Sequence, residues 1–331
     1  MVRVFMFNQL ARIIEGSFNY GIMRIFQKRL SLILLAGLIL VVVAGAGLYF
    51  RFARPIGSGP AGPTVKREWF SQTWTTNQIL LVGLGDSVTA GFGARKGYSY
   101  FDRLIKNPAD EFPDMDGLCL SRVLSNLRTT NLAVSGSTSL EVTARQLMLL
   151  KTNSLNVVGM VVITTGGNDL IHNYGRTPPR EEAMYGATTD EAAPWIENFG
   201  RRLETTIGQI QNRFPGGCLI FLANIYDPTD GLGDAEMAGL PPWKDSTKIL
   251  AAYNGVIQRC ADKFPAVRVV DMHGAFFGHG IHCTHFWRKS YDFHDPHYWF
   301  YSNLEDPNER GYDAIRRLFL IEIAKTQRQI K

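Results

Sequence analysis

The sequence lacks the patterns that commonly bind metals or nucleic acids. Its 331 residues include only four cysteines, and no two of them form a C-x-x-C pair. The formal net charge is only +5, and the basic residues are spread out rather than gathered in a stripe with aromatic residues. Internal repeats and low-complexity tracts are absent too. These absences argue against a nucleic-acid partner and leave one large globular core as the expected body of the protein.

Charged residues are missing from one long stretch near the N-terminus, residues 30–50. This apolar run is long enough to cross a bilayer as a single helix. Arg24, Lys28 and Arg29 precede it, which favours a cytoplasmic N-terminus and a periplasmic or extracellular C-terminal body. Residues 44–46, Ala-Gly-Ala, also fit a signal-peptidase site, so cleavage and secretion stay open. The apolar run continues beyond that site, which favours an uncleaved anchor.

The chain is therefore expected to have four segments. These are an N-terminal cytoplasmic segment that could include a mis-called start (1–29), a membrane helix (30–50), a linker rich in proline and glycine (51–75) and a single folded domain (76–331). In an exported domain the four cysteines could form one or two disulfides, although their spacing does not define the pairing.

Apolar runs alternate with amphipathic stretches over the C-terminal body. Strands are expected at 79–84, 130–134, 158–164, 218–224 and 266–271, and helices at 98–107, 117–127, 138–151, 195–213, 246–263 and 309–328. Continuous apolar strands separated by helices indicate a mostly parallel sheet that is covered on both faces. We expect a three-layer α/β/α sandwich. Three insertions, 173–194, 227–245 and 274–306, could shape a substrate pocket.

Three of the expected strands end in residues that suit attack on an ester. The sequence Gly-Asp-Ser-Val-Thr-Ala-Gly (85–91) follows the first strand and places Ser87 on a tight turn, where a serine can act as a nucleophile. Gly136 follows the second strand, and Asn168 lies in Gly-Gly-Asn-Asp after the third. The N–H groups of Ser87 and Gly136 and the side-chain amide of Asn168 could stabilise a developing oxyanion. Such a site needs no cofactor and no metal, and we predict neither.

These blocks resemble the SGNH (GDSL) hydrolase family over roughly residues 79–320. The family's first block reads G-D-S-x-T-x-G, its second supplies a glycine and its third contains G-x-N-D. The G-x-S-x-G elbow of α/β-hydrolases is absent around Ser87. The resemblance implies an acyl-enzyme mechanism and ester substrates such as small-molecule esters, acetylated glycans or lipids. The expected protein is a membrane-tethered, extracytoplasmic serine esterase.

The last block of the family departs from its pattern in this chain. The family places an aspartate and a histidine three residues apart, and the matching positions here are Asn303 and Asp306. The following Pro307 and Gly311 fit the family, and Asp306 is expected to cap the final helix. Without a histidine there, two alternatives stay open. The protein could be an inactive relative that binds envelope or carbohydrate ligands, or an acyltransferase that uses the same serine.

Six of the seven histidines lie between residues 273 and 297, so one of them could replace the missing base. We predict that His279 is that base, because glycines flank it and permit close approach to Ser87. Asp306 would then orient its imidazole. His297 and His282 are the alternatives for the base. The cluster could also hold zinc, but its spacing matches none of the common zinc signatures.

Overall fold

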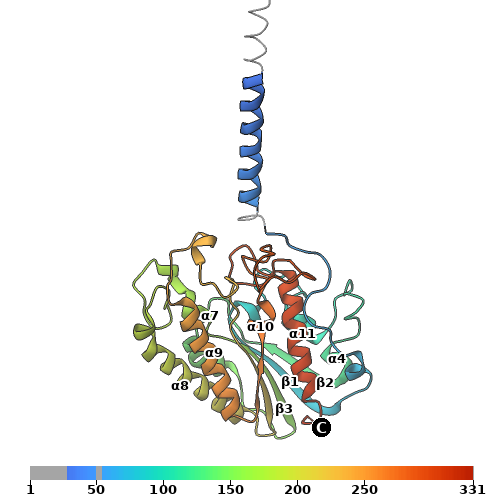
Figure 1. Cartoon of the computed structure of the whole chain (residues 1–331). Helices are drawn as coiled ribbons and strands as arrows, with labels where there is room; N and C mark the ends of the chain where they lie inside the picture. Colours follow the sequence, from blue (N-terminus) through green and yellow to red (C-terminus); the bar gives the residue numbers. More distant parts are fainter. Residues whose placement is uncertain (1–27, 50–53, 331) are drawn as a thin grey trace, which may run out of the picture. The chain divides into compact units, whose positions relative to one another are not determined.

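The computed structural model describes residues 28–49 and 54–330, and the chain divides into two units, Met1–Arg54 and Pro55–Lys331. The described part of the first unit includes one helix, Lys28–Tyr49, which is long and apolar enough to cross a membrane (Figure 1). It coincides with the predicted span. The predicted cytoplasmic segment falls almost entirely outside the described residues.

The second unit contains one parallel sheet of five strands in the order β2-β1-β3-β4-β5. The strands are β1 (Thr75–Gly85), β2 (Leu124–Asn131), β3 (Val157–Thr164), β4 (Cys218–Ala223) and β5 (Val267–Val270). β1 and β3 are central, and their register pairs Gly85 with Thr164 at the carboxyl end of the sheet. That end is where open α/β sheets bind their ligands.

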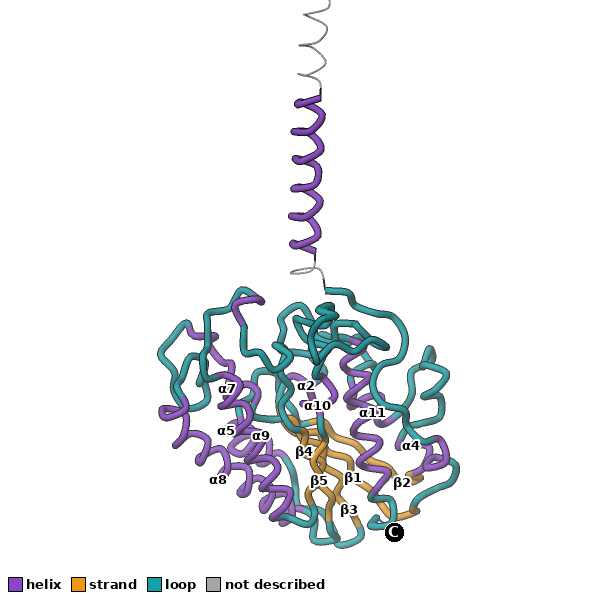
Figure 2. Tube along the Cα trace, viewed as in Figure 1, coloured by secondary structure: helices purple, strands orange, loops and turns teal. Residues whose placement is uncertain are grey.

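Helices cover both faces of the sheet, which confirms the predicted three-layer α/β/α sandwich (Figures 1 and 2). In β3, Met160 and Val162 pack in one apolar cluster and Val161 and Ile163 in the other, because successive side chains point to opposite faces. The first face carries α3 (Tyr100–Ile105), α4 (Leu120–Val123) and α11 (Glu309–Lys325); the second carries α5 (Ser139–Glu141), the π-helical η2 (Val142–Gln146), α6 (Leu147–Leu149), α8 (Thr189–Arg213) and α9 (Ser246–Lys263). Shorter helices are η1 (Arg67–Phe70), α2 (Ser87–Ala90), α7 (Gly167–Ile171), η3 (His172–Gly175), η4 (Ala235–Ala238) and α10 (Met272–Phe276).

The second strand is an exception to the predicted positions. We expected it at 130–134, whereas β2 begins at Leu124 and shortens the expected helix 117–127 to α4. β2 is one of the two edge strands of the sheet and pairs with β1 alone, and most of its residues are partly or fully exposed and polar. An edge strand of this kind has no continuous apolar run to reveal it.

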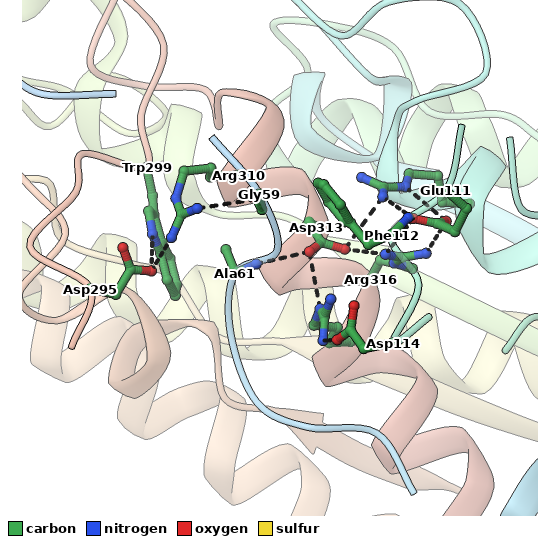
Figure 3. A network of polar contacts seen from close by, with 12 residues as sticks. Gly59, Ala61, Glu111, Phe112, Asp114, Asp295, Trp299, Arg310, Asp313 and Arg316 are labelled. Atoms are coloured by element: carbon green, nitrogen blue, oxygen red, sulfur yellow. Dashed lines mark hydrogen bonds and ion pairs between the residues drawn. The ribbon is translucent and has the colours of Figure 1, made fainter. Parts of the chain in front are cut away.

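The segment that leads into the domain is packed against α11 instead of lying free. The N–H group of Ala61 donates to Asp313 at 2.9 Å, and Arg310 donates to the carbonyl groups of Ser58 and Gly59 at 3.0 and 3.1 Å (Figure 3). Farther along, Trp74 is part of the core. The predicted linker 51–75 is thus bound to the domain over the part that begins at Pro55.

Cys119, Cys218 and Cys260 are free thiols in the described part of the chain, so none of the disulfides that we considered joins two of these three residues. Burial raises the pKa of the Cys218 and Cys260 thiols to about 11, which keeps both groups neutral at physiological pH. They fill apolar space as small hydrophobic side chains.

Candidate active site

The turn after β1 exposes one hydroxyl group among buried neighbours. Gly85 has φ +126°, and a Cβ atom there would lie 1.8 Å from the carbonyl oxygen of Thr164, so only glycine fits. Asp86 follows as the N-cap of α2 and accepts the N–H group of Val88 at 3.2 Å. Ser87 begins this short helix. It is partly exposed while Asp86 and Val88 are buried, which makes it the residue of the turn that a ligand can reach.

A chain of buried hydroxyl groups supports this turn from below. Thr164 donates a 2.7 Å hydrogen bond to Asp86, and Thr89 links Thr164 to the hydroxyl group of Tyr100, again at 2.7 Å. Burial raises the pKa of Asp86 to about 7, although the bond from Thr164 lowers it. The turn is therefore held by both backbone geometry and a satisfied polar network.

The predicted oxyanion donors come to the same end of the sheet. Asn168 is a buried residue of α7, and its side-chain amide donates to the carbonyl group of Ser137 at 2.9 Å, which leaves one amide hydrogen for a ligand. Val134 donates to Gly85 at 3.1 Å and so holds the loop containing Gly136 beside β1. Gly136 is exposed with φ +82°. Ser87 and Asn168 both line the cavity described below, and Gly136 lies on the adjoining loop.

Asp306 is the acidic residue that the structure places beside Ser87. Its Oδ2 atom accepts the side-chain amide of Asn303 at 2.7 Å. Burial raises the pKa of the Asp306 carboxyl group, whereas the Ser87 hydroxyl and Asn303 lower it. The other carboxylate oxygen, Oδ1, is buried without a hydrogen-bond partner among the described residues, so the Ser87 hydroxyl lies close but short of regular hydrogen-bond geometry.

The expected role of Asp306 as a helix cap is wrong. α11 begins at Glu309, and the side chain of Asn308 accepts the N–H groups of Arg310 and Gly311 at 3.0 and 3.1 Å. The cap therefore lies two residues beyond Asp306. This leaves the Asp306 carboxyl group turned toward Ser87 and Asn303.

His279 is bound elsewhere in the described structure. Its ring stacks on Trp299 with ring centroids 3.6 Å apart, and its Nδ1 atom lies 3.1 Å from the carbonyl oxygen of His297. Burial lowers the pKa of His279. The two alternatives also have other partners: His297 binds Asp295 at 2.5 Å, and His282 binds Asp234 at 2.9 Å.

All seven histidines belong to the described part of the chain, and none of them lines the cavity or hydrogen-bonds to Ser87. The structure thus does not bring His279 and Ser87 together, and the assignment of His279 as the base stays a prediction. Within the same described residues, no group of three or more His, Cys, Asp or Glu side chains is arranged to hold a metal ion.

A cavity of about 150 Å³ opens beside Ser87. Its walls are mainly apolar, and each predicted insertion contributes to them, as Tyr174, Leu240 and Ile281 illustrate. Other apolar lining residues are Ile171, Tyr185, Ile225, Trp243, Leu250 and Leu304. Glu305 also lines the cavity, and burial, with the nearby Asp306, raises its pKa to about 7. Sequence reasoning missed Glu305, although it is adjacent to the position that carries the family's dyad.

The fold and the order of these strand ends are those of a three-layer α/β/α hydrolase. The sequence profile of the GDSL-like Lipase/Acylhydrolase family matches residues 84–314, and the chain belongs to this family. It is an esterase- or lipase-like hydrolase. A comparison with curated proteins found no match.

The solved structures to which the chain is similar include esterases and lipases. An acetylxylan esterase from Geobacillus stearothermophilus is 18% identical, with 76% of this chain and 96% of that chain covered and a TM-score of 0.48. An extracellular lipase from Streptomyces rimosus is 19% identical (74% and 99% covered, TM-score 0.47). Phospholipase A1 from Streptomyces albidoflavus NA297 is 18% identical (75% and 99% covered, TM-score 0.46).

Proposed function

We propose that the protein is a serine esterase that prefers esters with an apolar acyl group. The observation that carries this proposal is that Ser87 is the accessible residue of a rigid turn and opens onto a cavity with apolar walls. Each methylene group buried in such a cavity contributes about 0.8 kcal/mol to binding. An acyl chain of several carbons therefore gains more from this cavity than an acetyl group does.

In the proposed reaction, the Ser87 hydroxyl oxygen attacks the ester carbonyl carbon. The N–H groups of Ser87 and Gly136 and the free amide hydrogen of Asn168 donate to the resulting oxyanion. Collapse of this intermediate breaks the bond to the alcohol and leaves an acyl group on Ser87. Water then attacks the acyl-enzyme, releases the acid and restores the serine.

In this proposal Asp306 accepts the proton of Ser87 and gives it to the departing alcohol oxygen. In the second step Asp306 takes a proton from the attacking water and returns it to the Ser87 oxygen. The Asp306 carboxyl group interacts with the Ser87 hydroxyl, and a raised pKa makes its carboxylate a stronger base than an ordinary aspartate. Asn303 holds the carboxylate in place. A carboxylate remains a weaker base than imidazole, so we expect slower turnover than a serine–histidine pair would give.

A second function is favoured by the lack of any histidine at Ser87 among the described contacts. In this alternative the protein binds an ester- or acyl-bearing ligand in the same cavity without turning it over. Labelling with a fluorophosphonate distinguishes the two, because it reports an activated serine without knowledge of the substrate. Labelling of wild-type protein but not of Ser87→Ala, with hydrolysis of p-nitrophenyl esters, supports the esterase. Ligand binding without labelling or turnover supports the alternative.

We also propose that the Lys28–Tyr49 helix anchors the chain in a membrane with the hydrolase domain on the extracytoplasmic side. The length and apolar character of this helix and the positive charges at its N-terminal end support this arrangement. Protease added to cells whose outer envelope has been removed, with the cytoplasmic membrane intact, should digest the domain. Intact-mass analysis should find the N-terminal residues retained, whereas a mature protein that starts after Ala46 would indicate cleavage and secretion.

A further inference from the structure

Three large aromatic side chains stand in solvent on one short part of the 274–306 insertion. The exposed fractions are 73% for Phe286, 66% for Trp287 and 76% for Phe293. Single exposed apolar residues are common on protein surfaces, but a group of large aromatic residues marks an interaction site. We call residues 286–293 the aromatic segment.

A buried scaffold fixes the start of the insertion that carries this segment. The carboxyl group of Asp230 accepts the N–H groups of Gly278, Gly280 and His282, each at 2.9 Å. Farther along, the ring of His285 stacks on Trp287 with centroids 4.8 Å apart. The start of the insertion is therefore fixed by buried bonds, and the packing of Trp287 on His285 lowers the conformational entropy that this ring loses on binding.

The chemistry of the segment matches a bilayer surface better than a water-filled ligand site. Trp287 combines a large apolar ring with an N–H donor, which is the combination that is enriched where membranes meet water. Arg288 and Lys289 follow it, and Lys289 is exposed. Basic residues beside exposed aromatic rings are typical of surfaces that bind lipid headgroups.

The covalent chain limits how far this insertion can lie from the proposed anchor. Tyr298 donates to the carbonyl group of Pro55 at 2.9 Å, so the insertion binds the first residues of the domain. Only residues 50–54 separate Tyr49 from Pro55. Even a fully extended chain covers about 20 Å over this distance. If the Lys28–Tyr49 helix spans a bilayer, the part of the insertion at Tyr298 is therefore tethered to the bilayer by a short stretch of chain.

The geometry points to a membrane-contacting function for the aromatic segment: Phe286, Trp287 and Phe293 insert into the interfacial region of the bilayer that holds the anchor helix. This inference rests on the proposed anchoring and is independent of the catalytic assignment. It gives the domain a second attachment to the membrane and fixes which face of the domain turns toward lipid.

Quenching of Trp287 by brominated lipid tests the inference in the full-length chain. The chain is reconstituted in vesicles of phosphatidylcholine and phosphatidylglycerol, and the spectrum of Trp287→Phe is subtracted to isolate the Trp287 signal. Brominated acyl chains should lower this signal about twofold or more. The double variant Phe286→Ser/Phe293→Ser should lose most of the quenching, while Leu155→Ser, an equally exposed apolar residue just before β3, should keep it.

Flotation of the vesicles separates the two ways in which the inference can fail. If the chain floats with the vesicles but Trp287 is not quenched, the aromatic segment does not touch lipid and the anchor stands. If the chain does not float, both the anchor and the membrane-contacting segment are overturned. Hydrolysis of a soluble p-nitrophenyl ester is measured in parallel and should be unchanged in the double variant, so failure of the esterase proposal is seen separately.

Discussion

The turn that carries Ser87 and the loop that carries Asp306 approach the same hydroxyl group, but they are held in different ways. The turn is fixed in part locally, by the positive φ of Gly85 and the bond from Val88 to Asp86, and in part by Thr164 at the end of the neighbouring strand β3. The loop is fixed by contacts over long distances, since its insertion is bound to Asp230 and to the start of the domain. A local constraint can be recognised in a sequence, whereas a distant one depends on the whole fold.

The largest expected effect lies in the turn. Ser87→Ala should lower kcat/KM by about 10⁴-fold or more, because no acyl-enzyme can form. The melting temperature should change little, since the partly exposed hydroxyl group is not part of the buried network. Steady-state kinetics on a soluble ester, with thermal unfolding as the control, measure both. Substantial activity in Ser87→Ala would show that Ser87 is not the nucleophile. The comparison between the Ser87 turn and the Asp306 loop would then have no catalytic meaning.

The variants Asp306→Asn and His279→Ala test whether the loop that carries Asp306 supplies the base for the Ser87 turn. If Asp306 is the base, its replacement should lower kcat by about 10²- to 10⁴-fold, the usual contribution of general base catalysis. His279→Ala should lose much less, because its ring packs on Trp299. Activity should also rise with pH through the pKa of Asp306, since the carboxylate is the active form. If instead His279→Ala is the inactive variant, the prediction from the sequence holds and the base comes from the insertion.

A smaller effect is expected at the third strand end. Asn168→Ala should lower kcat by about 10²-fold with little change in KM, because an oxyanion donor acts mainly in the transition state. Asn168→Asp serves as a companion variant that keeps the size of the side chain but removes the donor. If neither variant changes kcat, Asn168 serves only its bond to Ser137.

The stability of the wild-type protein and that of the Asp86→Asn variant should depend on pH to different extents. The folded-state pKa of Asp86 is raised to about 7 from an ordinary value of 3.8. The protonated carboxyl group therefore stabilises the fold fully below pH 3.8, and this contribution is lost as the pH rises toward 7 and beyond. Urea unfolding between pH 4 and 8 should show a decline in wild type that is weaker in Asp86→Asn. Equal slopes would show that the Asp86 carboxyl group is not strongly shifted.

The smallest expected effect concerns the start of the domain. A fragment that begins at Thr64 lacks the bonds of residues 58–61 to α11, so it should be less stable than one that begins at Pro55 by about 1–3 kcal/mol. Both fragments should keep kcat within a few-fold, since Ser87 and its network are intact. Equal unfolding free energies would mean that the packed segment contributes nothing.

The strands that contain an apolar run could be predicted: β1, β3 and β4 each have one, and the edge strand β5 keeps three valines around Arg268. Helices between these strands impose a parallel sheet. β2 was misplaced because this edge strand carries mostly polar residues at exposed positions. The Ser87 turn was also recognisable, because Gly85 and Asp86 act on adjacent residues. The walls of the cavity could not be recognised in the sequence, because they are formed by three insertions that are far apart along the chain.

The prediction for His279 illustrates the limit of local reasoning. Its glycine neighbours suggested freedom to approach Ser87. In the structure a Cβ atom on Gly278 would lie 2.0 Å from the carbonyl oxygen of Ser290, and one on Gly280 would lie 2.3 Å from that of Pro228. Both N–H groups are bound by Asp230. These glycines therefore serve close backbone packing, and no neighbouring residue in the sequence indicates that.

The hydrogen bonds between α11 and residues 58–61 determine where the N-terminal part of this protein can be exchanged for that of another protein. A foreign anchor or leader should leave the bonds of residues 58–61 to α11 intact as long as it is joined ahead of them. An exchange made later, at the start of β1, would remove backbone partners of Arg310 and Asp313, two buried charged residues of α11. In an engineered or naturally recombined relative, the tolerated crossover point should therefore fall near residue 55, about twenty residues before the sheet begins.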